Sequence, residues 1–149
     1  YKTGQKITPE GALKSRFVDV GDFILSNSMS FGKPYIMKTQ GYIHDGWFVF
    51  RLPKSIDTEF LWYLLASPFV MDQFIQLSSG AIVKNISGDL VKKTILPIPP
   101  IKEQKVMVIK FDSISQETKK LESIYNQKLQ DLEELKRSIL QKAFKGELT

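Results

Sequence analysis

The stretch Leu96-Pro97-Ile98-Pro99-Pro100-Ile101-Lys102-Glu103-Gln104 divides the chain into two parts of different character. The residues before it are rich in aromatic side chains and turn formers. The residues after it contain no Pro, and no Gly before Gly146. Proline suits the first turn of a helix, because its missing N–H has no helical partner there. We therefore predict that a long helix begins at Pro100 and that Pro99 enters it in an extended conformation.

The far end of this helix is also marked in the sequence. Lys142-Ala143-Phe144-Lys145-Gly146 places cations in the last turn and a glycine directly after them. This arrangement is typical of a helix stop. A helix of about 45 residues would be roughly 65 Å long at 1.5 Å per residue.

Apolar residues recur along the predicted helix in alternating steps of four and three, which is the spacing of a coiled-coil seam. Its apolar members are Met107, Phe111, Ile114, Leu121, Tyr125, Leu132, Leu135 and Ile139. Thr118 and Lys128 occupy two further seam positions, where polar residues weaken pairing but can fix the register. Because the preceding domain is too short to cover the whole seam, we expect the seam to pair with a partner helix.

The residues before the junction change from strand-like to helix-like patterns. Short aromatic and β-branched runs predict strands at 16–20, 23–26, 35–37, 42–44 and 47–52, and a last strand at 94–96. Asp57 and Ser67-Pro68 are start signals for two helices, and Ser87 caps a short turn. We expect the second helix to bury one face, made of Phe69, Val70, Phe74 and Leu77.

These patterns predict an α+β fold in two parts. Residues 1–98 would form a mixed α/β globular domain, and residues 99–149 a long helix that pairs and acts as a spacer.

The chain opens at Tyr1 without Met, so we expect a fragment or a processed chain. It has no Cys, no apolar run of about 18 residues and no signal-peptide pattern. We therefore expect a cytoplasmic protein with no membrane partner.

The charge is moderate. The formal net charge is +5, with 11 basic and 8 acidic residues up to Pro100 and 10 and 8 after it. A mildly basic domain is compatible with nucleic-acid binding but does not require it.

Catalytic patterns are missing from the sequence. His44 is the only histidine, and its neighbour Asp45 would point to the opposite face if both lay in a strand. We therefore expect His44 to be a loop or surface residue. With one His and no Cys a transition-metal site is not expected, and no phosphate-binding glycine loop occurs. We assign no catalytic residue and no metal ligand, and predict a binding module.

Four stretches resemble a known family: Val20–Leu25, Gly80–Ser87, Leu96–Gln104 and the final Leu135–Gly146. Together they resemble the specificity (S) subunit of type I restriction–modification systems, from one target recognition domain into the conserved helix after it. The Pro-Pro-x-x-Glu-Gln entry into a long helix is specific in combination with the Ser-Ile-Leu and Ala-Phe-x-Gly ending. The resemblance runs from about Val20 to the end, so we expect the first part of the recognition domain to be missing or divergent.

The resemblance implies a prokaryotic, non-catalytic subunit that recognises one half of a split site in double-stranded DNA. Two methyltransferase (M) subunits would dock on it and methylate adenine, and a restriction (R) subunit would add translocation and cleavage. S-adenosylmethionine, ATP and Mg would then belong to those partners, and this chain would bind no cofactor. Full S subunits have two recognition domains joined by two antiparallel helices. This chain would be half of such a subunit, or a half-subunit that forms a homodimer and recognises a split palindrome.

Side chains that bind base edges or phosphates are concentrated in the turns of the first part. The candidate DNA-binding residues are Lys14, Arg16, Asn27, Ser30, Lys33, Lys38, Gln40, Lys84 and Asn85. The alternative for each is an ordinary solvated loop residue. The alternative for the whole chain is a non-enzymatic coiled-coil scaffold or protein-binding module, which the modest charge and the long seam also permit.

Overall fold

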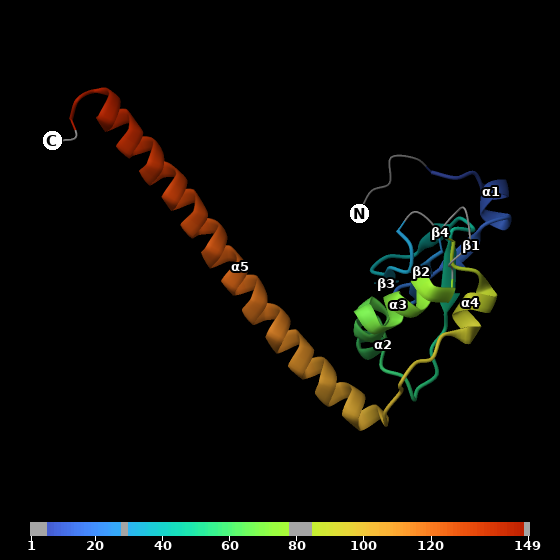
Figure 1. Ribbon diagram of the computed structural model, residues 1–149. Coiled ribbons are helices and arrows are strands. Elements are labelled where there is room, and N and C mark those ends of the chain that lie inside the picture. Colours follow the sequence, from blue (N-terminus) through green and yellow to red (C-terminus); the bar gives the residue numbers. More distant parts are fainter. Residues whose placement is uncertain (1–5, 28–29, 78–84, 148–149) are drawn as a thin grey trace. The chain divides into compact units, whose positions relative to one another are not determined.

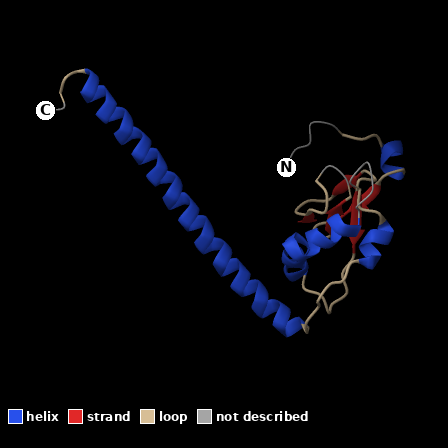
Figure 2. Cartoon of the chain, in the orientation of Figure 1, coloured by secondary structure: helices blue, strands red, loops and turns tan. Residues whose placement is uncertain are grey.

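The computed structural model describes residues 6–27, 30–77 and 85–147. It contains two compact units, Tyr1–Val108 and Ile109–Thr149, which we call the head unit and the helical unit. The head unit combines small sheets with short helices, and a single helix of 44 residues, α5 (Ile101–Phe144), begins in it and forms the helical unit (Figures 1 and 2). The predicted α+β class with a long C-terminal helix is confirmed.

Five short strands form two antiparallel sheets in the described part of the head unit. β1 (Arg16–Val18) pairs with β4 (Gly41–Ile43). β2 (Phe23–Ser26) is the central strand of a second sheet, between β3 (Pro34–Ile36) and β5 (Trp47–Phe50). All five correspond to predicted strands, although β1 and β5 end two residues earlier than expected.

Side-chain caps set the helix starts of the head unit. The carboxylate of Asp57 accepts hydrogen bonds from the backbone of Glu59 and Phe60, so α2 (Thr58–Ala66) begins as predicted. The hydroxyl of Ser87 caps α4 (Gly88–Lys93) in the same way. A further helix, α1 (Pro9–Leu13), was not predicted; Thr8 caps it and a proline opens it.

The core lies where β2 meets the helices that follow the sheet. All four residues of β2 are buried, and two of them, Phe23 and Leu25, pack in one cluster with side chains of α2 and α3 (Pro68–Leu77). The buried cluster consists of Phe23, Leu25, Leu61, Leu65, Val70, Phe74, Ile86 and Leu90. Close packing of this kind is the main stabilising contribution to a small domain.

The buried face of α3 is narrower than predicted. Val70 and Phe74 are 0% and 1% exposed, as expected, whereas Phe69 and Leu77 are 54% and 46% exposed. Gly32 explains the tight fit around Phe74. Its φ is +71°, and a Cβ at this position would lie 2.9 Å from the Phe74 ring. A side chain at position 32 would therefore be excluded both by backbone conformation and by space.

The predicted strand at 94–96 is wrong. Thr94 ends α4, and the backbone of Ile95 is paired by a side chain instead of a strand. The amide of Gln73 on α3 accepts from the Ile95 N–H at 2.9 Å and donates to the Ile95 carbonyl at 3.1 Å. An amide side chain thus satisfies both backbone groups that a neighbouring strand would have satisfied.

The junction is held by a buried amide. α5 begins at Ile101, one residue later than predicted, and the Pro100 carbonyl accepts from the backbone of Glu103 and Gln104. The Gln104 side chain is fully buried. Its nitrogen donates to the carbonyls of Pro99 at 2.7 Å and Ser55 at 3.0 Å, and its oxygen accepts from Asp57 N–H at 2.7 Å. Gln104 therefore ties the first turn of α5 to the loop that leads into α2.

The C-terminal end of α5 is the predicted glycine stop. Gly146 has φ +72°, its N–H donates to the Ala143 carbonyl, and the N–H of Glu147 donates to the Lys142 carbonyl. These two bonds define a Schellman motif.

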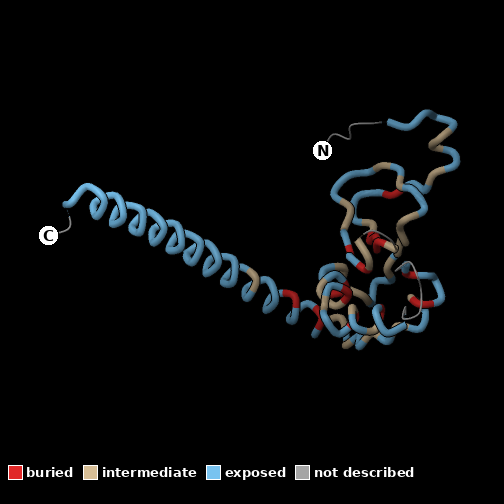
Figure 3. The backbone as a smooth tube through the Cα atoms, turned by 45° about the horizontal axis from the view of Figure 1, so that its top comes forward, coloured by how far each residue is buried: buried red, intermediate tan, exposed pale blue. Residues whose placement is uncertain are grey.

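Gln104 and Val108 are the buried residues of α5, and from residue 116 onward its described residues are exposed (Figure 3). None of the helices in the described ranges is long and apolar enough to cross a membrane.

Candidate nucleic-acid interface

Three chain segments meet at one end of the β3-β2-β5 sheet. β2 ends at Ser26, which lies opposite Trp47 at the start of β5. The Ser26 N–H donates to the Lys33 carbonyl, and the Asn27 N–H donates to the Gly46 carbonyl, each at 3.0 Å. The β2–β3 loop and the turn before β5 are thereby held side by side. We call this region, residues 27, 30–33 and 44–47, the loop end of the sheet.

Asn27 joins the loop end to the segment before α4. Its side-chain nitrogen donates to the Asp45 carbonyl at 3.1 Å, and its own carbonyl accepts from the Ile86 N–H at 2.8 Å. Asn85, which is exposed, is therefore brought beside the loop end. The Asn27 side chain therefore holds the turn at Asp45 in place, which is a structural role.

Arg16 reaches the same region from β1. Its Nη1 donates to the Trp47 carbonyl at 3.0 Å, which leaves other guanidinium N–H groups exposed to solvent. Lys14 and Arg16 line one side of an open recess of about 660 Å³, and His44 and Asp45 line the other. Two cations beside one carboxylate give this recess a net positive character, which suits a phosphate group.

The interpretation of His44 and Asp45 as strand neighbours is wrong, because β4 ends at Ile43 and both residues lie in the following turn. His44 Nδ1 is 3.6 Å from the Asp45 carboxylate, and both side chains are largely exposed, as expected for a surface pair. Nδ1 faces the Gly46 N–H at 2.9 Å and Nε2 faces the Trp47 indole N–H at 3.3 Å. A neutral imidazole has one free acceptor nitrogen, so the ring accepts from one of these donors at a time.

Three of the predicted DNA-binding residues lie in the loop end, and three more, Lys14, Arg16 and Asn85, lie beside it. Ser30 and Lys33 lie in the β2–β3 loop; Ser30 is half-buried and its carbonyl accepts from the Lys33 N–H, while Lys33 is exposed. Lys38 and Gln40 are exposed, but they follow β3 at the opposite end of the sheet, where Met37 pairs with Asp22. Lys84 lies outside the described residues. The structure therefore gathers Lys14, Arg16, Asn27, Ser30, Lys33 and Asn85, and separates Lys38 and Gln40 from them.

Aromatic residues at the loop end were not predicted as part of a site. The half-buried Trp47 ring packs edge-on against Tyr35 and His44, with centroids 5.5 and 6.3 Å apart. Tyr35 is 41% exposed, so it packs on the sheet and still presents ring surface to solvent. The dipeptide Asp45-Gly46 is a turn signal that the sequence analysis could have used. A turn at these two residues would have predicted that His44 and Trp47 lie on either side of it.

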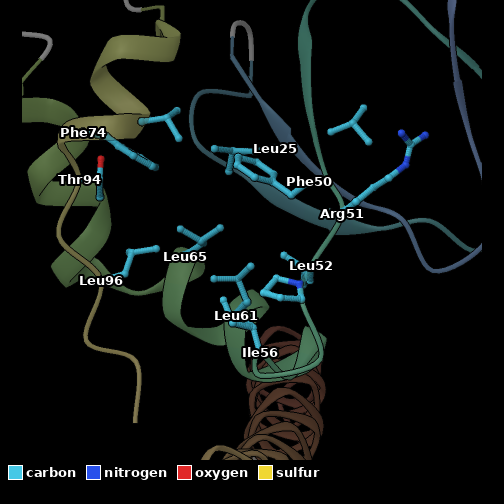
Figure 4. A pocket seen from close by; sticks show the side chains of 13 residues that line it. Leu25, Phe50, Arg51, Leu52, Ile56, Leu61, Leu65, Phe74, Thr94 and Leu96 are labelled. Carbon is cyan, nitrogen blue, oxygen red and sulfur yellow. The ribbon is translucent and has the colours of Figure 1, made fainter. Parts of the chain in front are cut away.

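A second hollow in the head unit is apolar. It measures about 410 Å³ and lies between β2, β5, the helices and the 94–96 segment (Figure 4). Its wall is formed largely by aliphatic and aromatic side chains such as Leu25, Phe50 and Leu96. The Thr94 hydroxyl on the wall already donates to the Leu90 carbonyl at 3.0 Å. This hollow therefore offers little polar chemistry, and we assign it to packing.

The helix α5 presents a different kind of surface. The eight apolar seam residues predicted from the sequence all lie on α5, and their exposed fractions range from 37% for Met107 to 62% for Tyr125. Apolar surface of this length is unusual on a protein that remains alone in solution. Pairing itself involves a second helix and stays a prediction.

Comparison with known proteins identifies one family. The sequence model of one protein family, the type I restriction modification DNA specificity domain, matches residues 2–134 of this chain. The chain is 33% identical over 102 residues to the EcoKI specificity subunit of Escherichia coli K12, which covers 66% of this chain and 22% of that protein. It is 28% identical over 120 residues to the EcoDI specificity subunit of Escherichia coli, covering 78% and 27%. The chain thus spans roughly a quarter of the length of these relatives.

A solved structure shares the fold. One chain of a structure concerned with complex assembly and conformational transition of the type I R-M system superposes with a TM-score of 0.72. The match covers 89% of the present chain and 33% of that chain, at 24% sequence identity. At this identity the similarity concerns the fold alone. The shared fold includes both the head unit and the long helix.

Proposed function

Because the chain belongs to the type I restriction–modification DNA specificity family, we propose that it is a DNA specificity module that recognises one half of a bipartite site. In this role the chain carries out no chemistry and directs a methyltransferase to its target. The observation that carries the proposal is the family match over residues 2–134. The clustering of basic and amide side chains at the loop end supports it independently.

The loop end has the chemistry that DNA recognition requires. Lys14, Arg16 and Lys33 can neutralise phosphates, and the exposed amide of Asn85 has the donor and acceptor pair that matches adenine. Exposed aromatic surface at Tyr35 lies next to these groups. Base recognition and phosphate contact would therefore come from one end of the sheet, which suits an approach of the head unit to a groove through its loops.

The remaining partners follow from the family and are proposed with it. M subunits would dock on the chain and use S-adenosylmethionine to methylate adenine, and an R subunit would join the complex with ATP and Mg. The seam of α5 would pair either with a second copy or with the second helix of a longer S subunit. A homodimer with antiparallel helices would present two identical heads in inverted orientation and recognise a split palindrome.

Duplex selection with the assembled complex tests this proposal. The chain and its companion M subunit would be incubated with a random duplex library at fixed salt, and bound duplexes would be sequenced. We expect a defined motif, which is lost in Arg16→Gln/Lys33→Gln and kept in Lys38→Gln. A wild-type complex that selects no motif would contradict the proposal.

The second candidate is a coiled-coil scaffold whose head unit binds protein. The exposed apolar seam of α5 favours it, since a scaffold needs a pairing surface and no DNA contacts. In that case Arg16→Gln/Lys33→Gln would leave complex assembly intact and no duplex would be enriched by either form. The same selection experiment therefore separates the two functions.

A further inference from the structure

The recess beside the loop end has cations on one wall and a carboxylate on the other. Lys14 and Arg16 belong to the first wall, and His44 and Asp45 to the second. A phosphate offers only acceptor atoms and negative charge, so a carboxylate in the same recess repels it. The edge of a base pair presents acceptors and donors side by side. A recess that holds both a cation and a carboxylate therefore matches a base edge better than a phosphate alone.

The guanidinium of Arg16 is held in one orientation. Its Nη1 donates to the Trp47 carbonyl at 3.0 Å, and Trp47 lies opposite Ser26 of the central strand. The edge formed by Nε–H and Nη2–H takes no part in this bond. Two donors on one rigid edge match the O6 and N7 acceptors of guanine. Because the side chain is already oriented, less conformational entropy is lost when it binds.

The turn that carries Asp45 is fixed on both sides of this residue. The Asp45 carbonyl accepts from the Asn27 side chain at 3.1 Å. The next residue, Gly46, has its N–H 2.9 Å from Nδ1 of His44. The Asp45 side chain is fully exposed, so a fixed backbone presents its carboxylate to solvent. A carboxylate only accepts hydrogen bonds, and the matching donor on a base edge is the N4 amino group of cytosine.

We propose that Arg16 and Asp45 together read one G·C base pair of the half-site from the major groove. Arg16 donates to O6 and N7 of the guanine, and Asp45 accepts from N4 of the cytosine paired with it. This inference rests on the proposed function and names the base pair that this part of the head unit recognises. The two walls of the recess thus supply the donors and the acceptor that one base pair requires.

A surface ion pair between the two side chains is the plain alternative. In the structure Arg16 bonds to a backbone carbonyl, and the Asp45 carboxylate lies 3.6 Å from Nδ1 of His44. Between the two walls lies an open recess of about 660 Å³. The donor edge of Arg16 and the carboxylate of Asp45 are therefore available to a third group that enters this recess.

Lys14 has a different role in this arrangement. It lies on the same wall as Arg16 and is exposed, but its ammonium is a point charge without a planar donor edge. Lys14 therefore suits a phosphate that borders the base pair. Loss of a phosphate contact weakens binding to all duplexes alike, whereas loss of a base contact changes the preference at one position. Lys14 is thus the matched control for Arg16.

Duplex selection with the complex of this chain and its M subunit tests the proposal in three single variants. The wild-type motif should contain a fixed G·C pair that Arg16→Ala relaxes by about 5- to 150-fold, with the other positions kept. Asp45→Ala should relax the same position. Lys14→Ala should keep the whole motif, and should reduce the slope of log K against log salt by about 0.9. Arg16→Ala that weakens all duplexes alike, as Lys14→Ala does, would make Arg16 a phosphate contact and overturn the proposal.

For Asp45 the proposal and its alternative predict opposite signs. A carboxylate that only lies near DNA repels phosphates, so its removal would raise the affinity for every duplex. A carboxylate that accepts from cytosine contributes to the preferred duplex, so Asp45→Ala lowers the affinity for that duplex. A uniform gain in affinity, or relaxation by Arg16→Ala and Asp45→Ala at two different positions, would overturn the shared base pair.

Failure of this inference and failure of the proposed function have different signatures. A wild-type complex that selects no motif contradicts the proposed function, and this inference falls with it. A wild-type motif that both Arg16→Ala and Asp45→Ala leave unchanged overturns this inference alone. A variant that keeps the other positions of the motif also shows that its head unit is folded, so a loss of preference at one position does not come from unfolding.

Discussion

The side-chain oxygen of Gln104 accepts a hydrogen bond from the backbone N–H of Asp57 at 2.7 Å, so the first turn of α5 and the residue that caps α2 are directly connected. The carboxylate of Asp57 in turn accepts from the N–H groups of Glu59 and Phe60. The start of α2 and the start of α5 are therefore set by one hydrogen-bonded chain. This accounts physically for a glutamine at the end of the Pro-Pro-x-x-Glu-Gln stretch.

Removal of the Gln104 amide should destabilise the head unit. Gln104→Ala leaves the Asp57 N–H and two carbonyls without their partner, and we expect the free energy of unfolding to fall by about 2 kcal/mol. Gln104→Glu should be at least as harmful, because its carboxylate can accept from Asp57 but would face the Ser55 and Pro99 carbonyls without donors. Urea denaturation followed by tryptophan fluorescence measures the change. Lys105→Ala, at an exposed neighbouring position, is the control and should have little effect.

Two phenylalanines of α3 should differ in their contribution to stability. Phe74 is 1% exposed and packs edge-on against Phe31 at 6.4 Å, so Phe74→Ala should cost about 3–5 kcal/mol. Phe69 is 54% exposed, and Phe69→Ala should change stability by less than about 1 kcal/mol. Thermal unfolding of both variants tests the assignment. Equal losses would mean that the buried face of α3 is as wide as the sequence suggested.

DNA binding should depend on which end of the sheet a lysine occupies. Lys33→Gln, at the loop end, should weaken binding of the assembled complex and reduce the slope of log K against log salt by about 0.9, the amount for one phosphate contact. Lys38→Gln removes the same charge at the opposite end and should leave the slope unchanged. Fluorescence anisotropy at several salt concentrations gives both slopes. Equal effects of the two variants would contradict the location of the interface.

The seam should be the only face of α5 that is sensitive to added charge. Leu132→Asp/Ile139→Asp places carboxylates on the seam and should convert the dimer to a monomer, since buried unpaired charges are strongly destabilising. Gln130→Asp/Arg137→Asp adds acidic residues on the outer face at neighbouring heights and should leave the dimer intact. Light scattering of the purified chains measures the mass. A double seam variant that stays dimeric would refute the seam assignment.

Features with a local cause could be predicted from the sequence. The cap at Asp57, the proline entry into α5 and the glycine stop at Gly146 each depend on residues within one helical turn. The strands before residue 52 were likewise marked by aromatic and β-branched runs. The heptad spacing of α5 is local too, because the alternating steps of four and three define the seam by sequence position alone.

Features that depend on distant contacts could not be predicted. The Ile95 backbone is paired by Gln73, which lies 22 residues earlier, so the strand-like composition of 94–96 was misleading. The separation of Lys33 from Lys38 follows from the direction of β3, which places its two ends at opposite ends of the sheet. The role of Trp47 at the loop end likewise depends on Arg16 and His44, which come from other segments.

The central proposal is that this chain directs a methyltransferase to one half of a split DNA site, either as part of a longer subunit or as one of two copies. The most direct measurement is to co-express the chain with its companion adenine methyltransferase and map the methylated adenines in the host DNA. We expect one split motif, with two identical half-sites in inverted orientation if two copies take part. A split motif with unlike halves would show that a second, different recognition domain takes part, and methylation without any motif would contradict the specificity function itself.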